Sequence, residues 1–126
     1  MSNDWLMRQI EDMTRLVASI VFHKKFEPYA ILEEDGQVNE ENLLYGRLRA
    51  RVRQGDIPGA EVLLIETLEK DPREEYLPVA LAFYEGLAQM DDARLHSCRY
   101  SREEILKGLV ALEERYGQKP DTKELP

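Results

Sequence analysis

The segment from Gln54 to Pro72, QGDIPGAEVLLIETLEKDP, predicts the turn and the second helix of a helical hairpin. Gly55 suits the position that follows a helix C-terminus, because glycine adopts positive φ without a Cβ penalty. Asp56 offers a side-chain oxygen to the free N–H groups of the next helix, and Pro58 is tolerated in its first turn. Pro72 disfavours helical geometry in the residue before it. We therefore expect a helix over residues 56–70.

An apolar stripe runs along this expected helix, in which Ala60, Leu64 and Leu68 recur every four residues. Together with the residues before it, the stretch 39–72 resembles a tetratricopeptide repeat, a helical hairpin of about 34 residues. The resemblance implies a fold of stacked antiparallel helical hairpins. The chain departs from the repeat pattern at Leu48, Arg51 and Thr67. A generic helical hairpin with the same turn chemistry is the alternative.

The composition limits the class of protein. A chain of 126 residues fits one domain, and a charged fraction of 33% fits helices with solvated outer faces. The net charge of −8 disfavours duplex nucleic acid and anionic membranes as partners. The single cysteine, Cys98, excludes a disulfide within the chain and is compatible with a reducing compartment. No export signal or membrane-spanning run is visible, so we expect a cytoplasmic protein.

Residues 1–25 predict a long amphipathic helix. Its apolar residues alternate at spacings of four and three, like the seam of a coiled coil. This candidate dimer seam consists of Leu6, Ile10, Met13, Val17 and Ile20. The helix therefore either packs on its own domain or pairs with a second copy of the chain to form a homodimer. A membrane-surface helix is disfavoured, because the polar face mixes acidic and basic residues.

Capping and breaking signals predict the remaining elements. Asn39 caps an expected helix over 40–54, and Ser101 with Glu104 forms a capping box for a helix that ends before Gly117. An apolar helix is expected over 74–90.

Loops are expected at 24–38 and 91–100, and the acidic run in the first lacks the alternating ligands of a calcium-binding loop. The prediction is an all-α chain of about five helices. It consists of the N-terminal helix at 1–25, a helical-hairpin domain at 39–117 and a flexible tail at 118–126.

Four arginines alternate along the expected helix 40–54, and helical geometry divides them into two pairs. Arg47 and Arg51 flank one edge of the apolar face, and Arg49 and Arg53 flank the other. Their stems can cover apolar surface while their charges meet acidic neighbours. A site for an acidic partner or a phosphate is the alternative, and nucleic acid is disfavoured because no aromatic residues interleave.

The expected helix 74–90 is apolar around much of its circumference, so it is predicted to be the most buried element. Its small residues Ala82 and Gly86 are expected to let a neighbouring helix approach closely. Tyr84 is a candidate exposed aromatic residue that a partner could contact, and packing of its ring in the core is the alternative.

No catalytic or metal-binding constellation is recognisable. His96 and Cys98 lie two residues apart, but a zinc site needs about four ligands and no third group is evident that would orient a nucleophilic pair. We predict no catalytic residue, no cofactor and no metal, and we expect a protein that is not an enzyme.

Two further stretches, DWLMRQIEDMTRLVA at 4–18 and YSREEILKGLVALEERYG at 100–117, carry a second resemblance. Together with the hairpin they resemble an uncharacterised family of small helical proteins from Gram-positive bacteria, a domain of unknown function. The resemblance implies a helical, repeat-like fold and brings no activity or ligand.

The function expected from these patterns is a non-catalytic protein–protein interaction or scaffold module. Stacked helical hairpins typically present extended binding surfaces. The candidate partner-binding residues are Tyr45, Arg47, Arg51 and Tyr84. The alternative is a small-ligand-binding regulator or an enzyme whose carboxylates meet only in the folded chain.

Overall fold

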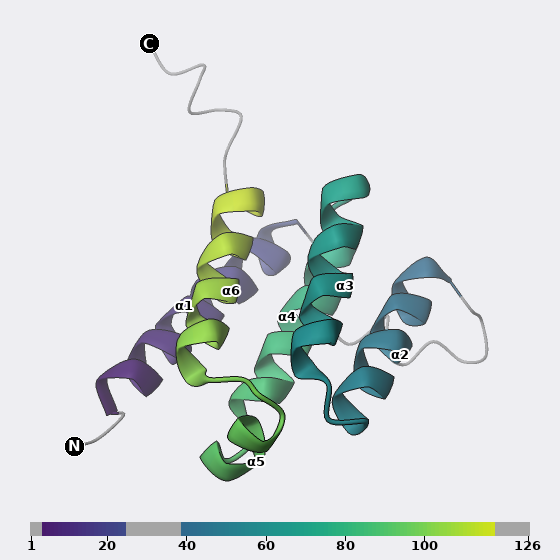
Figure 1. Ribbon diagram of the computed structural model, residues 1–126. Coiled ribbons are helices and arrows are strands. Elements are labelled where there is room, and N and C mark those ends of the chain that lie inside the picture. The colour runs from purple at the N-terminus through teal and green to yellow at the C-terminus, as the bar shows by residue number, and fades with distance from the viewer. Residues whose placement is uncertain (1–3, 25–38, 118–126) are drawn as a thin grey trace.

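The computed structural model describes residues 4–24 and 39–117, and these residues form six helices (Figure 1). The helices are α1 Asp4–His23, α2 Glu40–Arg53, α3 Ile57–Lys70, α4 Tyr76–Ala88, α5 Asp92–Ser97 and α6 Arg102–Tyr116. No strand occurs within the described ranges. The all-α prediction is confirmed. The expected connector loop, beyond Lys24, and the expected tail at 118–126 lie outside the described residues.

The α2–α3 hairpin forms through the predicted turn chemistry. Gly55 adopts a φ of +84°, and the Oδ1 atom of Asp56 accepts a hydrogen bond of 2.9 Å from the Gly59 N–H. At the start of α2, the Oδ1 atom of Asn39 accepts a 2.7 Å hydrogen bond from the Asn42 N–H. Both helices therefore begin where their capping side chains predict.

The loop expected at 91–100 is in part the short helix α5, which accounts for the sixth helix. The Oδ1 atom of Asp91 accepts a 2.8 Å hydrogen bond from the Arg94 N–H, so an N-cap starts this helix as well. Arg102 then fixes the segment between α4 and α6. Its guanidinium donates to the Met90 carbonyl at 2.6 Å and to the Asp92 carboxylate at 2.6 Å.

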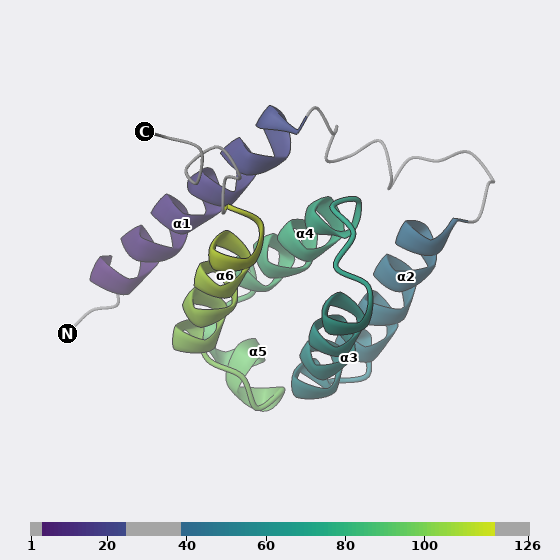
Figure 2. The same ribbon diagram turned by 90° about the horizontal axis from the view of Figure 1, so that it is seen from above.

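Helix α4 lies at the centre of the molecule. Helices α1 and α6 pack against it and against each other, and α2 packs against it on the other side, with α3 on α2 (Figure 2). Nine of its residues are buried, from Tyr76 to Leu87. The prediction that this helix is the most buried element is thus correct.

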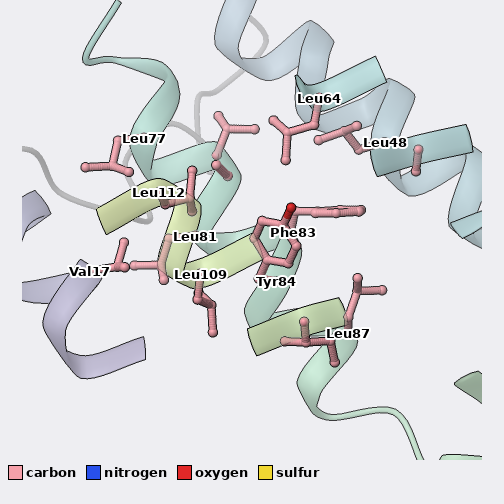
Figure 3. Close-up of a cluster of buried hydrophobic side chains, with 14 of the residues drawn as sticks. Val17, Leu48, Leu64, Leu77, Leu81, Phe83, Tyr84, Leu87, Leu109 and Leu112 are labelled. Carbon is pink, nitrogen blue, oxygen red and sulfur yellow. The ribbon is translucent and has the colours of Figure 1, made fainter. Parts of the chain in front are cut away.

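A single hydrophobic core joins the two halves across α4. The rings of Phe83 and Tyr84 meet edge to face, with centroids 5.1 Å apart. Figure 3 shows these two rings between Leu48 and Leu64 of the hairpin and Leu109 of α6. Aromatic pairs of this geometry stabilise a core beyond the area that they bury.

Candidate functional site

A groove lies between α2 and α4, and we call it the α2–α4 groove. Its volume is about 220 Å³. It is lined by Tyr45, Arg49, Val52, Arg53, Ala82, Phe83, Gly86, Leu87 and Met90. Apolar side chains form its floor, and the two arginines are its only charged lining residues among those described. The groove therefore combines an apolar surface with positive charge.

The arginines of α2 divide as helical geometry predicts, but the edge chosen from the sequence is not the one on this groove. Arg49 and Arg53 line the groove, whereas Arg47 and Arg51 do not. Arg51 points to the hairpin turn, where its guanidinium lies 3.7 Å from the Asp56 carboxylate. Arg47 is exposed. Of the four candidate partner-binding residues, only Tyr45 lines the groove.

Tyr45 and Arg49 interact one helical turn apart on α2. The Arg49 guanidinium carbon lies 5.7 Å from the centroid of the Tyr45 ring, within the range of a cation–π contact. The contact joins two side chains that both line the groove.

Gly86 leaves the groove open on the α4 side. A Cβ atom at this position would meet no other atom within 4 Å. The expectation that Ala82 and Gly86 admit a closely packed helix is therefore wrong at Gly86, which is exposed. The small residue creates open surface instead of a helix contact.

Tyr84 is buried and is not an exposed partner-binding residue, which corrects the sequence-based prediction. Its side chain is 2% exposed, and its hydroxyl donates a 2.7 Å hydrogen bond to the Glu61 carboxylate of α3. Burial and the neighbouring carboxylate raise the pKa of Tyr84 far above its usual range. The hydroxyl therefore stays protonated and acts as a fixed donor that ties α4 to α3.

Gly108 of α6 makes room for the Tyr84 ring. A Cβ atom at position 108 would overlap the Cζ, Cε1 and hydroxyl atoms of that ring. The ring thus lies directly on the α6 backbone. Nothing in the local sequence of either helix predicts this contact, because the two residues are 24 positions apart.

A second groove lies between α3 and α6, and we call it the α3–α6 groove. Its volume is about 410 Å³, and Tyr84 lies on its floor. Its charged lining residues are Glu61, Glu69, Glu104, Lys107 and Arg115, so both signs of charge are present. Glu61 was not singled out from the sequence, and Glu104 was singled out only as a capping-box residue, because only the fold brings α3 and α6 face to face.

Tyr100 is buried close to Glu61, which lines the α3–α6 groove. Its hydroxyl is buried and makes no hydrogen bond within the described residues. Burial, followed by the charge of the nearby Glu61, raises the pKa of Tyr100 far above its usual range. This hydroxyl therefore stays protonated beside the Glu61 carboxylate.

The candidate dimer seam lies against the body of its own chain. Leu6, Ile10 and Val17 are buried, and Met13 and Ile20 are partly buried against the same core. Helices α6 and α4 cover this face of α1. A homodimer through the seam would therefore require α1 to exchange between two chains.

Residues 4–24 and 39–117 contain neither a metal-binding cluster nor a membrane-spanning helix. No three or more histidine, cysteine or acidic side chains are placed there to hold a metal ion. None of the described helices is long and apolar enough to cross a membrane. Cys98 is buried, and its sulfur lies 3.9 Å from the Ser97 hydroxyl.

The helical architecture and the grooves beside α4 define an all-α protein without a recognisable catalytic site in its described part. Comparison with protein families matches residues 1–117 to a family of unknown function, DUF6483. The chain belongs to this family, since the match covers almost its whole length. Neither curated proteins nor solved structures gave a match.

Proposed function

We propose that this protein is a non-catalytic protein-interaction module and that the α2–α4 groove binds a segment of a protein partner. The observation that carries the proposal is the apolar floor of this groove, which stays open beside Gly86. A volume of about 220 Å³ is small for a drug-sized ligand, whose sites typically span about 300–1,000 Å³. It suits one or two apolar side chains of a protein segment.

The hairpin supports the same class of function. The turn at Gly55 and the cap at Asp56 are shared with tetratricopeptide-like hairpins, and folds of this kind use the surfaces between helices for binding. We propose a cytoplasmic location, which is supported by the single, buried cysteine.

The test fills the groove without altering the core. Gly86→Leu places an apolar side chain into space that no other atom occupies near its Cβ. Gly46→Leu is the matched control, because Gly46 is also an exposed helical glycine with no described atom within 4 Å of an added Cβ, and it lies outside the groove. Peptides displayed as a random library are selected on the full-length wild-type chain and then measured on both variants.

We expect enriched peptides to bind the wild type and Gly46→Leu equally and to lose binding to Gly86→Leu. Circular dichroism and thermal unfolding confirm that both variants are folded. Enriched peptides that bind all three proteins equally, or a library that yields no binders, would contradict the proposed site.

Small-ligand binding in the α3–α6 groove is the second candidate function. Three carboxylates, those of Glu61, Glu69 and Glu104, line this groove together with Tyr84. Its volume of about 410 Å³ lies within the usual range for small-molecule sites. Carboxylates beside an aromatic ring suit a cationic ligand. A thermal-shift screen with small amines, repeated on Glu61→Gln, tests it: stabilisation of the wild type that Glu61→Gln lacks supports this function.

A further inference from the structure

The charge around the α2–α4 groove is opposite in sign to that of the whole chain. The chain carries a net charge of −8. The described lining of the groove nevertheless contains two arginines and no carboxylate. A groove of one sign attracts partners of the other sign and disfavours partners of its own.

These two charges are not neutralised by the rest of the described chain. Arg51 of the same helix pairs with Asp56, and Arg73 pairs with Asp71 at 2.7 Å. Arg49 and Arg53, in contrast, make no ion pair with any residue in 4–24 or 39–117. The contact of Arg49 with the Tyr45 ring does not neutralise the charge of its guanidinium, and no carboxylate of the described residues pairs with it. Both arginines are exposed, so a partner can reach them.

The spacing of the arginines sets the spacing expected in a partner. Residues four apart on a helix lie on one face, one turn apart, with Cβ atoms about 5–6 Å from each other. Carboxylates one helical turn apart on a partner helix match this spacing. Apolar residues beside them on the same helix would meet Phe83, Leu87 and Met90 on the groove floor.

We propose that the occupant of the α2–α4 groove is an acidic amphipathic helix of another protein. Its carboxylates pair with Arg49 and Arg53, and its apolar row enters the groove beside Gly86. This inference rests on the proposed function and adds the chemistry of the partner. Helices of this kind commonly bind through an apolar face laid into a groove.

The experiment uses the peptides that are selected on the full-length chain, and it compares their sequences and the dependence of their binding on charge. The displayed peptides have about 20 residues, which is long enough for a helix of about 30 Å. We expect the peptides that depend on Gly86 to be enriched in Asp and Glu at helical spacing around apolar residues. Their affinity should fall about ten-fold for Arg49→Glu, since a close charge pair becomes a like-charge contact. Arg47→Glu is the matched control, because it changes the charge of the same helix equally at an exposed position outside the groove.

Charge reversal sharpens the result. A peptide in which each selected Glu is replaced by Lys should bind Arg49→Glu better than it binds the wild type. Added salt should weaken binding of the selected acidic peptide to the wild type, because it screens the charges. The apolar contacts should still contribute to the affinity. Vesicles containing phosphatidylserine serve as a second anionic probe and are expected not to bind.

The outcomes separate this inference from the proposed function. Peptides that depend on Gly86 but are neutral or basic would overturn the acidic partner and leave the groove as an interaction site. If Arg47→Glu and Arg49→Glu lower the peptide affinity equally, the net charge alone controls binding. That result would also overturn the inference. Vesicle binding that Arg49→Glu abolishes, without acidic peptides, would assign the arginines to a membrane surface instead.

Discussion

Two grooves flank the central helix, and they differ in what occupies the space beside a glycine. In the α2–α4 groove, the space beside Gly86 is empty, so the apolar floor is open. In the α3–α6 groove, the Tyr84 ring fills the space beside Gly108, and its hydroxyl is bound to Glu61. The same residue type therefore leaves open apolar surface on one side of α4 and makes a packing contact on the other. Only the neighbouring helix decides which of the two results.

The largest expected effect is that of Gly108→Ala. The added Cβ overlaps the Tyr84 ring, and the ring cannot move away without disturbing its hydrogen bond to Glu61. We expect the free energy of unfolding to fall by about 2–3 kcal/mol, as overpacked cores do. Urea denaturation measures it. In a Tyr84→Leu background, Gly108→Ala should lower the free energy of unfolding by less. An equal loss of stability in both backgrounds would show that the added Cβ does not clash with Tyr84.

The next effect is that of Tyr84→Phe, which removes the hydroxyl but keeps the ring on Gly108. Loss of a hydrogen bond to a carboxylate should lower the free energy of unfolding by about 1–2 kcal/mol. Larger losses are not expected, because Glu61 is only partly buried and water can replace the lost donor. Thermal and urea unfolding measure the loss. Glu61→Gln keeps an acceptor oxygen, so it should lower the free energy of unfolding by less than Tyr84→Phe does. If Glu61→Gln costs more than Tyr84→Phe, the carboxylate has a further role in the α3–α6 groove.

Gly86→Ala should have a smaller effect and the opposite sign. Alanine loses less backbone entropy than glycine in a helix, and its Cβ meets open space here. We expect the free energy of unfolding to rise by about 0.5–1 kcal/mol. Gly46→Ala on α2 is the control and should give a similar gain. A loss of stability for Gly86→Ala alone would mean that the groove is closed in solution.

The smallest effect is expected for Arg49→Ala and Arg53→Ala. Both side chains are exposed and make no ion pair within the described ranges, so each change should alter the free energy of unfolding by less than about 0.5 kcal/mol. Chemical denaturation of the two single variants checks this. A loss above about 1 kcal/mol would show that the arginine stems stabilise the fold by covering apolar surface, as the sequence analysis first favoured.

The elements of this fold are largely predictable from local sequence, because caps and turns act within a few residues. Asn39, Asp56 and Ser101 each begin a helix where their side chains predict. Helix α5 was expected to be a loop because six residues are too few for an apolar periodicity to show, although Asp91 carries the capping signal.

The candidate site was less predictable, because it depends on contacts between distant segments. The helical periodicity correctly assigned the arginines of α2 to two edges of its apolar face. It does not indicate which of these edges a neighbouring helix leaves open. The apolar circumference of α4 likewise left open whether Tyr84 packs in the core or faces a partner, and it did not indicate that Gly86 faces outward. Both orientations are set by Gly108 and the α2 helix, which are remote in sequence.

The central position of α4 also has a consequence for hydrogen exchange. Helices α1 and α6 cover one side of α4 and α2 covers the other, so neither half of the molecule can leave without exposing its buried residues. Its amide hydrogens are therefore expected to exchange with solvent only when the whole chain unfolds, whereas those in the first turn of α1 are expected to exchange through local opening. The slowest-exchanging amides thus lie in the one helix that both grooves share.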